Sequence, residues 1–169
     1  MPDKRELYIN GQWTPARDRK TFPVLNPATG EVWTQVADAT RQDAAAAIAA
    51  AAAAQPAWAA LPHTERARLL GRIADVLTAR AKEFQQALVD EGGSWIGKAM
   101  FETGYSAGVY RAAAAAAYQV NGEIIPSEYG KLSLVVREPL GVVSVISPWN
   151  FPLILSSRGF AVALAVGNT

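Results

Sequence analysis

The chain of 169 residues contains no cysteine and only one histidine, His63. Without cysteine it can form no disulfide and no metal site that uses thiolate ligands. A single histidine does not support a site built from several imidazoles either. The sequence therefore predicts no metal site.

The chain also lacks an excess of charge. Its 16 basic and 15 acidic residues leave a formal charge of +1. It has no basic block of the kind that binds nucleic acid and no acidic tail. The polar start of the chain, residues 1–6, has no apolar core of a signal peptide. We therefore expect a cytoplasmic protein with no nucleic-acid partner.

Half of the residues are apolar, and the length suits one domain with a sizeable core. Residues 7–13 predict a short hairpin with its turn at Asn10-Gly11, the strongest local hairpin dipeptide. Residues 22–30 form a second turn-rich segment, and residues 31–36 are extended. These pieces are typical of edge strands beside a helical body.

An alanine-rich helix is predicted next. Thr40 and Asp43 have the spacing of a capping box, with a hydroxyl at the cap and a carboxylate three residues later. A disordered low-complexity linker is the alternative, but alanine is the best helix former. We expect this helix to end at Gln55-Pro56.

A second helix is predicted to follow Pro62, with Thr64 as its cap, because apolar residues recur at helical spacing. It should stop at Gly92-Gly93. Residues 92–99 nearly match a phosphate-binding loop, but Ala99 occupies the position of the hydroxyl that would hold magnesium. The segment also follows a helix, whereas such loops follow a strand, so we interpret it as a turn between helices.

A third helix is predicted from about Ala99 to Tyr118. Gly104 and Gly108 lie four residues apart, which favours close packing of another helix on that face. After it, residues 123–126 and 132–138 predict a hairpin arm. Protruding apolar residues on such an arm indicate a partner surface.

The segment of residues 142–152 is the centre of the prediction. The apolar run 142–146 predicts a strand buried on both faces, and Pro152 suits the first turn of a helix. Asn150 would then lie at the carboxyl end of a strand, where open α/β sheets place ligands. A role as the cap of the following helix is the alternative.

Residues 151–166 predict an apolar helix. A membrane span is disfavoured by the broken backbone before this helix and by Arg158 within it, so we expect a buried core helix. Gly167 predicts its end, and a second parallel strand should follow. Because no such strand follows Thr169 in the sequence, we expect the sequence to be truncated.

Several motifs together resemble the N-terminal part of an NAD(P)-dependent aldehyde dehydrogenase, along essentially the whole chain. They are Tyr8-Ile-Asn-Gly-Gln-Trp13, Asn26-Pro-Ala-Thr-Gly30, the capped alanine-rich helix, Glu138-Pro-Leu-Gly-Val142, Pro148-Trp-Asn-Phe-Pro152 and Gly167-Asn-Thr169.

The resemblance implies an incomplete α/β aldehyde dehydrogenase fold. Residues 1–118 would be the N-terminal part of the cofactor-binding domain. Residues 119–140 would be an oligomerisation arm that pairs subunits into a homodimer or homotetramer. Residues 141–169 would begin a Rossmann-like sheet, and the catalytic domain is absent.

The resemblance also implies roles for single residues. Asn150 would donate its side-chain amide to the oxyanion of a thiohemiacetal formed by a small-molecule aldehyde. Neighbouring residues would contact NAD or NADP and line the aldehyde tunnel. The cofactor residues would be Ile146, Ser147, Pro148 and Trp149, and the tunnel residues would be Phe151, Ile154, Leu155 and Arg158.

Arg158 replaces the aromatic residue that is commoner at this position in the family. In having an arginine here, the chain resembles relatives that oxidise aromatic aldehydes such as benzaldehyde, vanillin and salicylaldehyde. The planar cation of Arg158 could stack on an aromatic ring or meet a ring oxygen. An arginine at the edge of the core, satisfied by backbone carbonyls, is the alternative.

The family's nucleophilic cysteine is missing here, because the chain has no cysteine. Its catalytic glutamate and cofactor-binding lysine would lie beyond Thr169. We therefore predict that the 169 residues alone are inactive. Two alternatives stay open: a fragment of a CoA-acylating aldehyde dehydrogenase, and a short non-catalytic assembly partner of full-length subunits.

Overall fold

The computed structural model describes residues 6–169 of the chain. Within this part the fold is mixed α/β, with helices and small antiparallel sheets. The first hairpin pairs β1 (Leu7–Ile9) with β2 (Gln12–Thr14). Its turn residues Asn10 and Gly11 have positive φ angles of 51° and 77°, as tight hairpins require. The predicted turn is confirmed.

A second antiparallel hairpin consists of β3 (Thr21–Leu25) and β4 (Val32–Ala37). The turn between them uses the Asn26 side chain, whose Oδ1 accepts from the Ala28 N–H at 2.9 Å. Gly30 takes a φ of +74°, a conformation that favours glycine. The extended pieces expected here are therefore strands of one hairpin.

The alanine-rich helix α1 (Arg41–Ala60) begins as predicted, because the Thr40–Asp43 capping box is formed. Its predicted end at Gln55-Pro56 is wrong: Pro56 lies inside the helix. Tertiary contacts hold this last part in place. The Gln55 side chain donates to the Gly167 carbonyl at 3.3 Å, and the Trp58 indole N–H donates to the Leu164 carbonyl at 3.0 Å.

The single helix predicted between Pro62 and Gly92 is divided into α2 (His63–Ala79) and α3 (Ala81–Asp90). The predicted cap at Thr64 is wrong as well, because the N-cap position belongs to Pro62. The break lies at Arg80, whose φ and ψ are −101° and 18°. Just before it, the Thr78 hydroxyl donates to the Ala74 carbonyl at 2.8 Å, a contact that bends helices.

The turn predicted over the near match to a phosphate loop is confirmed. The backbone N–H groups of Gly92 and Ser94 both donate to the Leu88 carbonyl, and Gly93 has a φ of +61°. The next helix, α4 (Ile96–Ala116), ends in the short 3-10 helix η1 (Ala117–Gln119).

Gly104 and Gly108 do not serve close helix packing, so that prediction is wrong. A Cβ atom added at either glycine would meet no atom within 4 Å, and both residues are exposed. The packed face of α4 consists of other small or polar residues instead. The buried residues are Ala99, Glu102, Thr103, Ser106, Ala107, Tyr110 and Ala113.

The core lies between α2, α4 and the last helix, α5 (Pro152–Ala165). It is built largely from alanine with a few larger side chains, which lets the helices approach closely. Its buried residues are Ala67, Leu70, Ala74, Leu77, Ala107, Tyr110, Ala113, Ala117, Ala161 and Ala165. The prediction that α5 is a core element is confirmed. No helix among residues 6–169 is long and apolar enough to cross a membrane.

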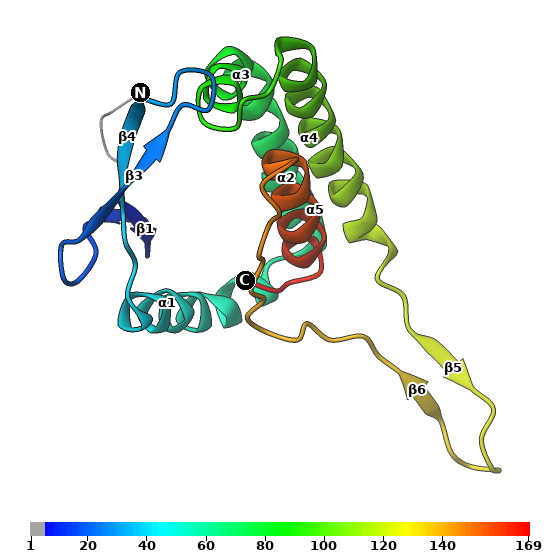
Figure 1. The fold of residues 1–169 in the computed structure, drawn as a ribbon. Helices are drawn as coiled ribbons and strands as arrows, with labels where there is room; N and C mark the ends of the chain where they lie inside the picture. Colours follow the sequence, from blue (N-terminus) through cyan, green and yellow to red (C-terminus); the bar gives the residue numbers. More distant parts are fainter. Residues whose placement is uncertain (1–5) are drawn as a thin grey trace.

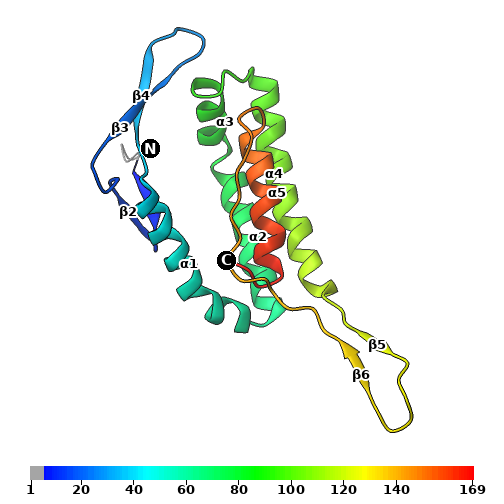
Figure 2. The same cartoon turned by 60° about the horizontal axis from the view of Figure 1, so that its bottom comes forward.

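The predicted hairpin arm is present as β5 (Glu123–Ile125) and β6 (Ser133–Val135). It extends away from the helices in both views (Figures 1 and 2). Pairs such as Ile124 and Leu134 face each other across the arm and are exposed to solvent. An arm with this apolar surface is unusual in a monomer.

Residues 142–146 are extended, but they do not form the fully buried strand that the sequence predicts. Alternate residues are exposed, and Ile146 is 92 % exposed. Two backbone hydrogen bonds join the start of this segment to Thr169. The Val143 N–H donates to the Thr169 carbonyl at 2.7 Å, and the Thr169 N–H donates to the Gly141 carbonyl at 2.9 Å.

These paired bonds follow the pattern of two neighbouring parallel strands. The second parallel strand stays a prediction. No other described strand lies beside residues 144–146. Figure 1 shows how the elements are arranged: β3 and β4 stand on one side, α1 crosses the bottom, and α2 to α5 stand opposite.

Candidate functional site at the start of helix α5

Asn150 lies in the turn that joins the extended segment to α5, and its side chain is exposed. The N-cap of α5 is Phe151, and no side chain in the cap position bonds to the helix. Within residues 6–169, no hydrogen bond engages the Asn150 amide. The capping role considered for Asn150 is therefore absent, and its amide is free to meet a ligand.

The N-terminus of α5 is capped by Glu102, which comes from α4. The backbone N–H groups of Leu153 and Ile154 donate to Glu102 Oε1 at 2.8 and 3.3 Å. The Glu102 side chain is 0 % exposed. A carboxylate suits this place, because a helix N-terminus carries unpaired N–H groups and a partial positive charge.

Lys98 completes the buried pair. Its Nζ lies 2.8 Å from Glu102 Oε2 and 2.8 Å from the Ser94 hydroxyl. The same ammonium lies 4.5 Å from the centre of the Phe151 ring, within the range of a cation–π contact. One lysine therefore contacts both the helix-capping carboxylate and the residue that follows Asn150.

On one side of the turn there is an open, mainly apolar pocket of about 540 Å³. Trp149 contributes to its wall and is 84 % exposed. The other wall comes from α3 and from the turn between β3 and β4. The lining residues are Pro27, Phe84, Ala87, Leu88, Glu91, Gly92, Trp149, Pro152, Leu153 and Ser156.

Of the four residues predicted to contact the cofactor, Trp149 lines this pocket and the other three do not. Ile146, Pro148 and Trp149 are exposed, whereas Ser147 is half-buried. The Ser147 and Ser156 hydroxyl oxygens are 2.7 Å apart and share a hydrogen bond. This bond ties the end of the extended segment to the second turn of α5.

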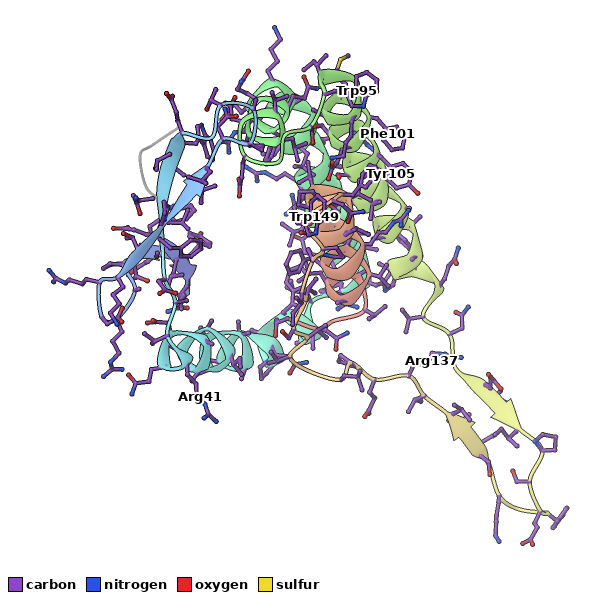
Figure 3. The ribbon with its side chains drawn as sticks, in the orientation of Figure 1. Arg41, Trp95, Phe101, Tyr105, Arg137 and Trp149 are labelled. Carbon is purple, nitrogen blue, oxygen red and sulfur yellow. The ribbon has the colours of Figure 1, made fainter. Side chains whose placement is uncertain are left out.

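A row of aromatic side chains runs along α4 and its start: Trp95, Phe101 and Tyr105 (Figure 3). The Phe101 and Tyr105 ring centres are 5.6 Å apart. Arg158 reaches this row from α5. It donates to the Tyr105 hydroxyl at 3.0 Å, and its guanidinium carbon lies 5.3 Å from the ring centre.

The structure shows which residues Arg158 contacts, and a contact between Arg158 and a substrate stays a prediction. Its partner is the Tyr105 side chain, and within residues 6–169 it donates no hydrogen bond to a backbone carbonyl. Phe151 and Leu155 are half-buried, and Ile154 is 5 % exposed as part of the core. Their place in a substrate tunnel stays a prediction.

Four neighbours of the site were missed by the sequence reasoning: Lys98, Glu102, Phe101 and Tyr105. Each lies on α4, far from Asn150 in the sequence. The spacing of four residues within each pair was visible, because such pairs share a helix face. The partner of that face could not be identified from spacing alone.

Tyr110 lies behind the site, buried between α4 and α5. Burial raises the pKa of its phenol, and a hydrogen bond with the Ser157 side chain opposes that rise in part. No group of three or more potential metal ligands occurs among residues 6–169.

Residues 13–169 match the sequence profile of the aldehyde dehydrogenase family. The chain belongs to this family. The prediction of the family, and of the N-terminal part of its α/β fold, is therefore confirmed. Curated relatives that are similar to this chain include dehydrogenases named for aromatic aldehydes.

A vanillin dehydrogenase of Pseudomonas fluorescens is 48% identical over 166 residues, which cover 96% of this chain and 34% of the relative. A salicylaldehyde dehydrogenase of Pseudomonas putida is 38% identical over 167 residues, covering 98% and 35%. The chain thus spans about a third of the length of the curated relatives it matches.

Solved structures agree. A salicylaldehyde dehydrogenase from Pseudomonas putida G7 complexed with salicylaldehyde superposes with a TM-score of 0.94 and 38% identity, over 97% of this chain and 34% of that one. An NAD-dependent benzaldehyde dehydrogenase from Corynebacterium glutamicum gives 0.94 and 38%, over 99% and 37%.

Proposed function

We propose that the complete product of this gene oxidises an aldehyde, of the aromatic class, to the carboxylic acid with NAD or NADP. The observation that carries the proposal is the unengaged amide of Asn150. Asn150 is exposed at the start of α5, and its amide makes no capping hydrogen bond, because Glu102 caps that helix.

The chemical role of Asn150 is to donate a hydrogen bond to the substrate oxygen. Attack of a cysteine thiolate on the aldehyde carbon would place negative charge on that oxygen in a thiohemiacetal. A donor fixed in advance stabilises such charge more than water does. The cysteine is not among these 169 residues, so we propose that they are inactive alone.

The cofactor would lie against Ile146, Ser147, Pro148 and Trp149. Ile146 and Trp149 are exposed and Trp149 lines an open pocket, and such apolar and aromatic side chains fit a flat ring system better than a hydrated ion. When bound, NAD(P) supplies the acceptor for the hydride of the aldehyde. The residues of this chain hold and orient it.

Arg158 and the aromatic row support an aromatic substrate. A planar guanidinium already stacked near Tyr105 offers a second face or a free N–H group to a substrate ring or its hydroxyl. The relatives named for vanillin and salicylaldehyde, and the structure named for benzaldehyde, point to the same class.

The test is an assay of the complete gene product with benzaldehyde, vanillin and salicylaldehyde, following NADH or NADPH formation. We expect acid formation without CoA. Asn150→Ala should lower kcat by about 10²–10³-fold. A requirement for CoA would instead support the acylating branch, and an inactive complete product would support an assembly role.

Two controls define the result. Glu65→Ala removes an exposed glutamate that pairs with Arg68 on α2, and it should leave kcat unchanged. The isolated 169-residue chain should produce no NADH from any of the aldehydes. Aldehyde-dependent NADH formation by that chain would contradict the proposal that the nucleophile lies elsewhere.

A further inference from the structure

We infer that Glu102, held by Lys98, is a positioning residue that determines where the Asn150 amide lies. The inference rests on the proposed oxyanion role of Asn150. It adds two side chains of α4 that do not touch the substrate oxygen but act on it through the turn.

The first observation is that the first turn of α5 takes its hydrogen-bond acceptor from another helix, in addition to the Ser147–Ser156 bond that joins the two sides of the turn. The N-cap residue of α5, Phe151, supplies no side-chain hydrogen bond to the helix. The Leu153 and Ile154 N–H groups find their acceptor 51 and 52 positions earlier in the sequence. The orientation of the first turn of α5 is therefore set from α4.

The second observation is that Lys98 and Glu102 contact the residues that directly follow Asn150. Lys98 meets the ring of Phe151, the next residue, and Glu102 meets the two N–H groups that follow Pro152. Pro152 has a restricted φ angle. The backbone from residue 151 to residue 154 is thus held at successive points.

The third observation is that the pair of Glu102 and Lys98 is itself held in place. The Glu102 side chain has no exposure and that of Lys98 has 19 %, and the ammonium that pairs with Glu102 also donates to the buried Ser94 hydroxyl. A buried carboxylate without its cation is costly. Each member of the pair therefore holds the other in one arrangement.

Position matters for an oxyanion donor because its benefit depends on alignment before the reaction. A displacement of about 1 Å can cost about 10²-fold in rate. Removing the Glu102 carboxylate frees two N–H groups and lets the turn and its amide move. The consequence is a lower kcat with little change in KM for the aldehyde.

The experiment is a double-mutant cycle in the complete gene product, with Glu102→Ala, Asn150→Ala and both together. We expect Glu102→Ala to lower kcat by about 10–100-fold and to change KM for benzaldehyde by less than about threefold. In the Asn150→Ala background, the same change should lower kcat by no more than about twofold, because the amide it positions is gone.

A purely structural role predicts a different result. Glu102→Ala would then lower kcat by equal factors in both backgrounds, or would leave kcat unchanged while lowering the unfolding temperature. Either outcome overturns the inference and leaves the role of Asn150 intact. If Asn150→Ala alone does not lower kcat, the proposed function fails first, and the inference fails with it.

Two milder variants cover the case in which Glu102→Ala does not fold. Glu102→Gln keeps an oxygen that can accept from Leu153 and Ile154 but loses the ion pair, and Lys98→Met loses the cation alone. Both should reduce kcat less than Glu102→Ala and should show the same coupling to Asn150. Additive effects of these variants would overturn the inference, and Glu65→Ala serves as the uncoupled control.

Discussion

At the scale of single residues, function here depends on which side chains are already engaged. Asn150 is available because another residue performs the capping that its position invites. Arg158 is engaged, but with the face and hydroxyl of Tyr105. The hydrogen-bond partners of these two side chains decide what they can do, and the residue types alone do not predict those partners.

Arg158 provides a test of substrate class. Arg158→Leu removes the planar cation, so we expect KM for benzaldehyde to rise by up to about tenfold. KM for a short aliphatic aldehyde should change by less than about twofold, because that substrate has no ring to stack. Steady-state kinetics with both substrates measure the difference. An equal change for both would show that Arg158 only supports Tyr105.

Tyr110 predicts a pH effect. Because burial raises its pKa in the folded state, the stability it contributes is complete below the ordinary pKa of tyrosine. That stability is lost as pH rises from this value through the raised one. We expect the free energy of unfolding to fall as the pH rises above about 10.

Tyr110→Phe should reduce this alkaline loss, because it has no phenol to ionise. Urea unfolding of both proteins at pH 7 and at pH 10.5, an alkaline value chosen from the ordinary tyrosine pKa of about 10, provides the measurement. Curves that fall in parallel for the two proteins would contradict the assignment to Tyr110.

At the scale of elements, local chemistry made the ends of several elements predictable. The Thr40 capping box, the Asn10-Gly11 turn and Pro152 at the start of α5 each depend on residues within one turn of the chain. What failed depended on distant contacts. The helix continues past Pro56, where Gln55 and Trp58 donate to carbonyls at the end of α5 and just after it, and no pattern near Pro56 carries that information.

The candidate site divides in the same way. Asn150, Trp149 and Arg158 could be found because they lie in or near one motif of a recognisable family. Glu102 and Lys98 could not, because their effect requires α4 and α5 to be packed together. The prediction of a buried strand at residues 142–146 was wrong for a related reason. No strand of the described chain lies beside this segment to cover it.

Gly159 tests the contact between α5 and the extended segment. A Cβ atom at Gly159 would lie 2.5 Å from Val145 Cγ1, a distance that forces a shift. We expect Gly159→Ala to destabilise the protein by about 1–3 kcal/mol and to lower kcat, because the segment leads into the Asn150 turn.

The matched control is Gly108→Ala on α4, where the added methyl group meets nothing within 4 Å. It should stabilise the protein by about 0.4–1 kcal/mol, because alanine favours helix more than glycine does. Denaturant unfolding measures both variants. A stability for Gly159→Ala at or above that of the unmodified protein would show that Val145 can move freely.

At the scale of the whole molecule, the projecting arm is the clearest sign of assembly. Its exposed Ile124 and Leu134 lie opposite each other on β5 and β6. We propose that the arm joins subunits into a dimer or tetramer. Exposed apolar residues on a projecting arm are otherwise a liability.

Leu134→Asp should therefore reduce the mass of the complete gene product in solution, because a charge in an apolar interface is costly. Light scattering after size-exclusion chromatography measures that mass. Glu128→Gln changes an exposed charged residue near the tip of the arm and should leave the mass unchanged. An unaltered mass for Leu134→Asp would place the interface elsewhere.

The way α5 is fastened also has a consequence for folding kinetics. Its start is held by Glu102, and its last carbonyls accept from the side chains of Trp58 and Arg66. These contacts join positions that lie 51, 106 and 99 residues apart. Contacts of such length close late, because each one requires the loop between its ends to be ordered. The Asn150 turn should therefore be among the last parts to become protected from hydrogen exchange during refolding.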